Sequence, residues 1–193
     1  MAELINIFSR LEKIFGSIEL NYVIVGGIAI IHYGYVRSTQ DIDIIMEDKS
    51  ELFPKFLNLL KENNFDLASD QFYQAYKEKT HVSVFDNESH IRLDIKIASR
   101  EPEIDVLENA KLEKISNYKL RIAPLEYVLL GKLLFIGDID DIPESELLEY
   151  QDILDFIMVY NSNKDQVNEE FIKKEAEKLG LQNTLDKLKA IKI

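Results

Sequence analysis

The spacing of apolar residues predicts helices and strands in alternation over the first part of the chain. Residues 2–15 place apolar side chains at helical spacing, which is typical of an amphipathic helix packed against a core. Residues 22–25 are all apolar, as in a strand buried on both faces, and a glycine pair ends this run. A short apolar helix through His32 and a β-rich strand over residues 41–46 are expected next.

The remainder of the chain changes first to a strand-like pattern and then to a helical one. Residues 50–62 predict a helix with Pro54 in its first turn. Residues 80–98 alternate between apolar and polar side chains on either side of the polar segment 86–89, which predicts a hairpin. Helical turns are expected over 102–110, a strand pair within 112–123, and helices over 124–134, 144–160, 167–179 and 182–190.

This order of elements predicts an α/β (α+β) protein, in which a mixed β-sheet is flanked by helices and followed by a helical C-terminal region. We therefore divide the chain into an α/β core over residues 1–123 and a helical region over residues 124–193. The segment 137–143 is interpreted as a loop within the helical region and not as a linker between domains.

Composition narrows the class of protein. Hydrophobic residues make up 46% of the 193 residues and charged residues 30%, as in folded globular proteins. A net charge of −12 argues against indiscriminate nucleic-acid binding, which depends on lysine and arginine contacts to phosphates. No apolar run is long enough to cross a bilayer, so we expect a cytoplasmic protein without membrane contact. Since there is no cysteine, a metal would be held by oxygen ligands.

The tripeptide Asp-Ile-Asp occurs twice, and the surrounding sequence separates the two copies. Asp41 and Asp43 lie in a predicted strand, where residues two apart project from the same face, so both carboxylates can reach one hard cation. Asp138 and Asp140 lie in an acidic loop between a glycine and a proline, which favours a solvated turn. The first copy is therefore the candidate for chemistry.

Asp94 is the candidate third carboxylate. In the predicted strand 91–98 the apolar side chains take the core face, so Asp94 faces the other way, with a basic residue two positions before it and another two after it. If this strand lies beside residues 41–46, three carboxylates converge, which suits two divalent ions that clamp the attacking and leaving oxygens of a phosphoryl transfer. The alternative is a surface ion pair between Asp94 and Arg92 or Lys96.

Residues before the first Asp-Ile-Asp are candidates for binding phosphate. Gly26 and Gly27 end a buried strand and begin a helix, where missing side chains let the backbone approach a phosphate, although the pair is also suited to a simple tight turn. Arg37 precedes Asp41 by four residues, so it is a candidate to bind a phosphate or to orient Asp41 or Asp43. An ordinary loop arginine is the other interpretation.

Taken together, these motifs resemble a known family. The segments Val25–Ala29, His32–Gly34 and Arg37–Asp43 resemble the signature of the DNA polymerase β-like nucleotidyltransferase superfamily. Its small bacterial and archaeal branch has a Gly-Gly, His-x-Gly, Arg-x-Thr-x-Asp-Ile-Asp pattern, and lincosamide nucleotidyltransferases and the nucleotidyltransferase toxins of toxin–antitoxin pairs are similar. The resemblance implies a nucleotidyltransferase core with a mixed sheet, a nucleoside triphosphate, for which we favour ATP, and two Mg²⁺ ions, or Mn²⁺ in their place.

The resemblance also implies roles for single residues. Asp41, Asp43 and Asp94 would be metal ligands, Asp94 also taking the proton of an acceptor hydroxyl, and the glycine pair would lie on the phosphates. Lys132 resembles the family lysine that contacts the triphosphate, although a lysine near the end of an apolar helix also commonly extends into solvent. Relatives commonly carry a basic residue before an acid where this chain has Gln151 and Asp152, so no role is assigned to Asp152.

We therefore expect a Mg²⁺-dependent nucleotidyltransferase that moves a nucleoside monophosphate from a triphosphate to an acceptor hydroxyl and releases pyrophosphate. The acidic charge favours a small-molecule or protein acceptor over a long nucleic acid, with the end of a transfer RNA left open. The alternative from another class is a non-catalytic nucleotide-binding or toxin–antitoxin component that acts by protein association. A third interpretation is a Mg²⁺ hydrolase that uses no acceptor.

Overall fold

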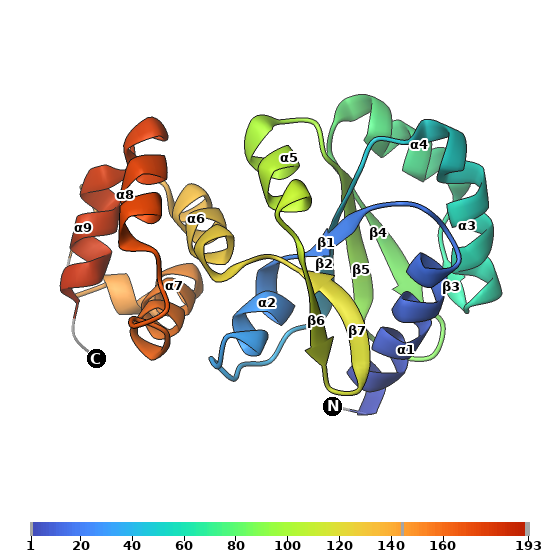
Figure 1. Cartoon of the computed structure of the whole chain (residues 1–193), viewed down its shortest axis with the longest axis horizontal. Coiled ribbons are helices and arrows are strands. Elements are labelled where there is room, and N and C mark those ends of the chain that lie inside the picture. The colour runs from blue at the N-terminus through green and yellow to red at the C-terminus, as the bar shows by residue number, and fades with distance from the viewer. Residues whose placement is uncertain (1, 144, 192–193) are drawn as a thin grey trace. The chain divides into compact units, whose positions relative to one another are not determined.

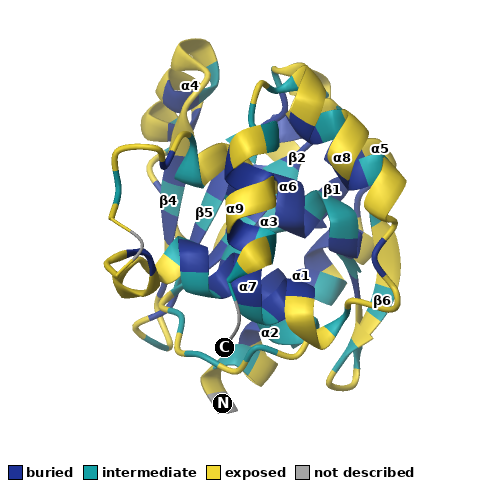
Figure 2. Ribbon diagram, turned by 90° about the vertical axis from the view of Figure 1, so that its left-hand side faces the viewer, coloured by how far each residue is buried: buried dark blue, intermediate teal, exposed yellow. Residues whose placement is uncertain are grey.

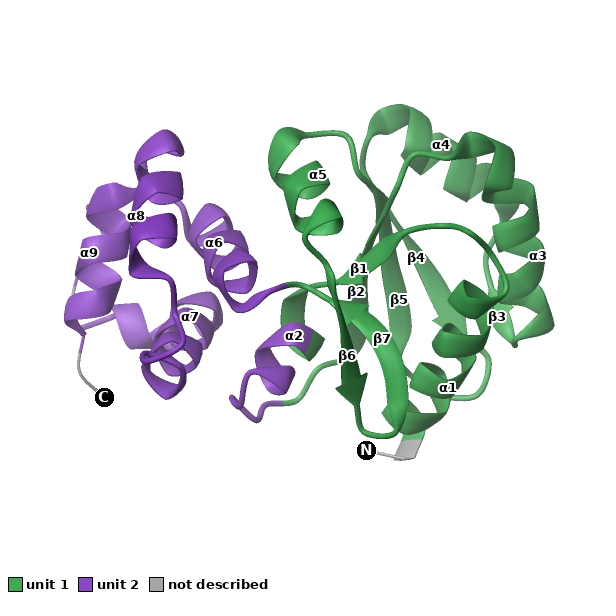
Figure 3. Cartoon of the chain, viewed as in Figure 1, with its two compact units in different colours: residues 1–28, 38–123 green, residues 29–37, 124–193 purple. Residues whose placement is uncertain are grey.

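The computed structural model describes residues 2–143 and 145–191, which divide into two compact units (Figure 3). The core unit contains the residues up to 28 together with residues 38–123. The helical unit contains residues 29–37 and the chain from residue 124 onward. The short segment 29–37 therefore belongs with the helical unit, although its neighbours on both sides along the chain belong to the core unit.

A mixed sheet forms the centre of the core unit (Figure 1). Within the described residues it has seven strands in the order β3-β4-β5-β2-β1-β7-β6. The pairs β1–β7 and β2–β5 are parallel, and the other neighbouring strands are antiparallel. The strands are β1 (Tyr22–Ile24), β2 (Asp41–Met46), β3 (Phe65–Asp66), β4 (His81–Asp86), β5 (Arg92–Ile97), β6 (Lys111–Ile115) and β7 (Tyr118–Ile122).

Helices cover both faces of this sheet. Helices α1 (Ala2–Gly16) and α3 (Phe53–Glu62) pack against one face, and their apolar stripes include Phe15, which stacks on Tyr22 of β1 with ring centroids 3.6 Å apart. Helix α5 (Glu101–Glu108) packs on β1 and β2 at the opposite face (Figure 1). The remaining helical elements of the core unit are η1 (Ser50–Leu52), α4 (Ser69–Glu78) and the start of α2 (Gly26–His32).

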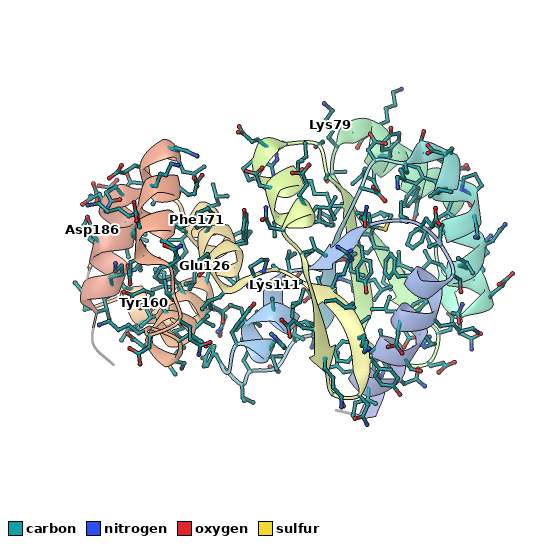
Figure 4. All side chains as sticks on the ribbon, viewed as in Figure 1. Lys79, Lys111, Glu126, Tyr160, Phe171 and Asp186 are labelled. Atoms are coloured by element: carbon teal, nitrogen blue, oxygen red, sulfur yellow. The ribbon has the colours of Figure 1, made fainter. Side chains whose placement is uncertain are left out.

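The helical unit is built around α6 (Leu125–Ile136), an apolar helix that packs against α7 (Gln151–Ser162) and α8 (Glu169–Lys178). Helix α8 buries one narrow stripe and leaves most of its remaining residues exposed, coloured yellow in Figure 2. Figure 4 labels one residue on each of these three helices, namely Glu126 on α6, Tyr160 on α7 and Phe171 on α8. The Glu126 carboxylate accepts a hydrogen bond from the backbone of residue 168, and Phe171 lies against Tyr127. The unit also contains η2 (Leu147–Glu149) and α9 (Gln182–Ala190).

The structure confirms a mixed sheet flanked by helices, corrects the expected start of one helix and contains two elements that the sequence analysis did not predict. The helix expected over 144–160 begins only at Gln151, because the backbone of Tyr150 is extended after the short turn η2, while residue 144 itself lies outside the described residues. Strand β3 and helix α4 were not predicted. Helix α4 is mostly polar and buries Phe72 and Ala75, too few positions to give a clear apolar stripe. No helix in the described part of the chain is long and apolar enough to span a membrane.

Candidate active site

Two neighbouring strands of the core unit place three carboxylates on one face of the sheet. In β2 every second residue is buried, and Asp41 and Asp43 occupy the half-buried positions between them. Strand β5 has the same alternation, with Asp94 half-buried between buried apolar neighbours. Because strand side chains alternate between faces, Asp41 and Asp43 share one face of β2, and Asp94 projects from the corresponding face of β5.

The register of these strands brings the carboxylates together. Strands β2 and β5 are parallel, with Asp43 directly opposite Asp94 and Asp41 directly opposite Arg92. Strand β4 lies on the other side of β5 and places Ser83 opposite Asp94. The adjacency that would make the three carboxylates converge is therefore present in the sheet.

Neighbouring side chains contact the carboxylates of Asp41 and Asp94. Arg92 lies between Asp41 and Asp94, with its Nη2 3.1 Å from Asp41 Oδ2 and its Nε 3.1 Å from Asp94 Oδ2. Its hydrogen bond to Asp94 and the attraction of the carboxylates raise the pKa of Arg92. Ser83 Oγ donates to Asp94 Oδ1 at 2.6 Å, and Thr39 Oγ1 donates to Asp41 Oδ1 at 3.0 Å. The surface pair considered for Asp94 is thus formed, but it belongs to a cluster that also includes Asp41.

As these side chains stand, no group of three or more His, Cys, Asp and Glu residues in the described part of the chain is arranged to hold a metal ion. The guanidinium of Arg92 supplies positive charge to Asp41 and Asp94 instead. The donors nevertheless suit a hard divalent cation, because carboxylate oxygens are the ligands that Mg²⁺ prefers in proteins. Arg92 thus contacts carboxylate oxygens of Asp41 and Asp94 that are also candidate metal ligands.

The turn at Gly26 explains why glycine precedes the carboxylates. Gly26 has a φ of +61°, and a Cβ added to it would lie 1.8 Å from Asp43 Oδ2. Any side chain at this position would therefore collide with the carboxylate and also require a left-handed backbone. The glycine makes room for Asp43 beside the start of α2, a consequence that the sequence pattern did not reveal.

The two basic residues expected to bind phosphate lie together in the helical unit. Arg37 Nε is 3.0 Å from Asp155 Oδ1, and Lys132 Nζ is 2.6 Å from Asp155 Oδ2. Lys132 also pairs with Asp152 Oδ1 at 2.6 Å, and its side chain is only 11% exposed. The interpretation that Lys132 merely extends into solvent is therefore wrong. The sequence analysis did not identify Asp155. The one signal for it is its position one helical turn after Gln151 and Asp152, which would place it on the same helix face as these residues.

The second Asp-Ile-Asp has a different setting. Asp138 and Asp140 lie in an exposed loop after α6, and Asp138 Oδ1 accepts a hydrogen bond from the backbone of Asp140 at 2.8 Å. Asp140 pairs with Lys187 and Asn183 of α9. The loop copy thus forms a turn and surface contacts, as expected, and the two acids are not arranged as they are in β2.

A buried acid anchors the end of β5 beside the cluster. The Glu103 carboxylate accepts hydrogen bonds from the backbone of Ser99 at 2.9 Å and from Arg100 Nε at 2.7 Å, and it pairs with Lys96 Nζ at 2.6 Å. Burial disfavours its charged form, but these donors outweigh burial and lower the pKa of Glu103 to about 2. Since Lys96 is two residues after Asp94, this network ties α5 to the face of β5 that carries the carboxylate.

Comparison with known families and structures gives consistent results. A family model described as "Nucleotidyltransferase of unknown function (DUF6036)" matches residues 2–127. No curated protein matches the sequence. The antibiotic-resistance factor ANT(2'')-Ia, in complex with adenylyl-2''-tobramycin, is similar with a TM-score of 0.56 and 12% identity, over 96% of this chain and 99% of that one.

The solution structure of the same factor gives a TM-score of 0.55, also at 12% identity and with the same coverage. An antigenic nucleotidyltransferase-like protein from Paracoccidioides brasiliensis is similar with a TM-score of 0.53 and 18% identity, over 95% of this chain and 91% of that one. Because the sequence identities are this low, these structural similarities show that the chain shares the fold of these proteins and nothing more.

Proposed function

The chain belongs to this nucleotidyltransferase family, and on that premise we propose that it transfers a nucleoside monophosphate from a triphosphate to an acceptor hydroxyl and releases pyrophosphate. ATP is the nucleotide we favour. One observation carries the proposal: Asp41, Asp43 and Asp94 project from one face of two paired strands, with Asp43 directly opposite Asp94. Such a set of carboxylates suits the binding of divalent ions for phosphoryl transfer.

In this proposal Asp41, Asp43 and Asp94 hold Mg²⁺ or Mn²⁺. When bound, the metal would neutralise charge on the phosphates and on the attacking and leaving oxygens. Ser83 keeps the Asp94 carboxylate in place through its hydrogen bond, and Thr39 does the same for Asp41. Asp94 lies directly opposite Asp43 in the paired strand. We assign to its carboxylate the role of the base that accepts the proton of the acceptor hydroxyl.

Four further residues are proposed to bind the phosphates. Gly26 and Gly27 lie at the start of α2, and we assign their backbone to the triphosphate on the basis of the resemblance. Arg37 and Lys132 are assigned to phosphate groups because the helical unit gathers both cations at one point. Phosphate groups form strong hydrogen bonds with such charged donors.

The acceptor is proposed to be a small molecule that carries a hydroxyl group. The neighbour ANT(2'')-Ia is described with adenylyl-2''-tobramycin, in which an adenylyl group is attached to a small molecule. The charge of −12 also disfavours a polynucleotide, which requires several basic contacts to its phosphates.

The proposal is tested by incubating the purified chain with each of the four nucleoside triphosphates, labelled at the α-phosphate, with Mg²⁺ and a pool of small hydroxyl compounds. We expect pyrophosphate release, with the α-label transferred to an acceptor. Release of free nucleoside monophosphate without transfer would indicate the hydrolase. Nucleotide binding without any product would contradict catalysis and favour the component that acts by association.

A further inference from the structure

Arg37 and Lys132 share one buried counter-ion in the helical unit. Asp155 of α7 is fully buried, and each of its carboxylate oxygens faces a different cation. Oδ1 is 3.0 Å from Arg37 Nε, and Oδ2 is 2.6 Å from Lys132 Nζ. One carboxylate therefore fixes two cations that come from separate segments of the chain.

The Asp155 side chain is itself held in place. Gln151, one turn earlier on α7, donates from Nε2 to Asp155 Oδ1 at 2.9 Å. Asn163, at the end of the same helix, donates to the backbone carbonyl of Tyr33 at 2.8 Å, which attaches the segment carrying Arg37 to α7. A buried carboxylate with these partners cannot leave its cations without leaving charge uncompensated, so its position is fixed.

Lys132 has a second anionic partner of a different kind. Its Nζ is 2.6 Å from Asp152 Oδ1, the same distance as from Asp155. The Asp152 side chain is 34% exposed, whereas that of Asp155 has no exposure. Asp152 is therefore the more accessible of the two acids that pair with Lys132, and its replacement by an incoming anion would disturb fewer buried contacts than replacement of Asp155.

We propose that Asp155 is a positioning residue that holds Arg37 and Lys132 for the phosphates of the nucleotide, and that Asp152 is the anion that a phosphate replaces on Lys132. This inference rests on the phosphate-binding role given to the two cations under the proposed function. It assigns opposite effects to two acids that lie on one helix and contact one lysine.

The test compares Asp155→Asn with Asp152→Asn in the full chain. The probe is inorganic tripolyphosphate with Mg²⁺, which contains no base, and its Kd is measured by isothermal titration. If the acids acted only through their charge, removing either one would tighten anion binding. We expect Asp152→Asn to tighten binding severalfold and Asp155→Asn to weaken it about tenfold or more, the range for losing one hydrogen bond to a charged group.

Asp155→Asn leaves two cations without their buried partner and could therefore weaken binding by disturbing the fold. A second pair of variants is the control for this effect. The double variant Arg37→Gln with Asp155→Asn keeps the net charge of the chain, and it is compared with Arg37→Gln alone. We expect the double variant to bind tripolyphosphate more weakly than Arg37→Gln, because Lys132 has lost its anchor.

The outcomes separate this inference from the proposed function. If the wild type binds tripolyphosphate and Asp155→Asn binds it as tightly or more tightly, or if the double variant matches Arg37→Gln, the positioning role is wrong and the nucleotidyltransferase proposal stands. If the wild type binds neither tripolyphosphate nor any nucleoside triphosphate, the phosphate role of both cations fails and the inference fails with it.

Discussion

Replacing Glu103 by glutamine tests how much the buried anchor beside the carboxylate cluster contributes to folding. The Glu103 carboxylate is nearly inaccessible and accepts hydrogen bonds from Ser99 and Arg100 while it pairs with Lys96. Glutamine keeps the size of the side chain but removes the charge that these donors stabilise. We therefore expect Glu103→Gln to fold like the wild type at neutral pH and to be less stable.

The magnitude follows from the pKa of Glu103. A fall in its pKa from 4.5 to about 2 corresponds to about 3 kcal/mol, since each pKa unit is worth about 1.4 kcal/mol. The folded chain releases this proton more readily than the unfolded chain. The contribution is therefore complete above pH 4.5 and is lost as the pH falls from 4.5 towards 2, with about 2 kcal/mol lost by pH 3.

The assay is urea unfolding of the wild type and of Glu103→Gln at several pH values between 7 and 3. The control is Glu101→Gln, which removes the same charge from an exposed position in the first turn of the same helix. The difference in unfolding free energy between wild type and Glu103→Gln should shrink as the pH falls, and that for Glu101→Gln should remain small. A difference for Glu103→Gln that is small at pH 7, or that does not change with pH, would refute this reasoning.

Three other predictions follow from the core unit and from the charge of the chain. Gly26→Ala should abolish turnover and lower the free energy of unfolding by at least about 1 kcal/mol, because the added Cβ collides with Asp43 and the backbone is left-handed at this position. Normal turnover in a stable variant would contradict the geometry of the turn. Arg92→Gln removes the guanidinium that lies 3.1 Å from Asp41 and from Asp94, so the affinity for Mn²⁺, measured by electron paramagnetic resonance, should increase. An unchanged affinity would show that Arg92 does not compete with the metal. Transfer RNA should bind weakly; tight binding with a log–log salt slope near −0.9 per phosphate, together with label transfer to the RNA, would overturn the small-molecule acceptor.

The candidate carboxylates could be found from the sequence because their placement depends on local periodicity. Asp41, Asp43 and Asp94 alternate with apolar residues, and a strand places such residues on one face whatever surrounds it. The pairing of β2 with β5 and the alignment of Asp43 with Asp94 are long-range features. They depend on which strands meet, which an apolar pattern within one strand does not determine.

The partners of the basic residues could not be found in the same way. Arg37 lies close to Asp41 in the sequence, and this proximity suggested a partner in the first Asp-Ile-Asp. In the structure Arg37 pairs with Asp155, which belongs to a helix much later in the chain. That helix was itself predicted to begin too early, because the apolar residues of η2 continue its pattern across the extended Tyr150. Side-chain partners across distant segments depend on packing that local patterns do not encode.

The most direct test of the central claim compares two aspartates that occupy the same place in the same tripeptide. Asp43 is the second acid of Asp-Ile-Asp in β2, and Asp140 is the second acid of the copy in the exposed loop. The measurement is pyrophosphate release from the triphosphate that the wild type uses, with melting temperatures to verify folding. We predict that Asp43→Asn abolishes release without unfolding the chain, and that Asp140→Asn keeps wild-type release. Wild-type release by Asp43→Asn would contradict the assignment of the active site to the carboxylates of β2 and β5.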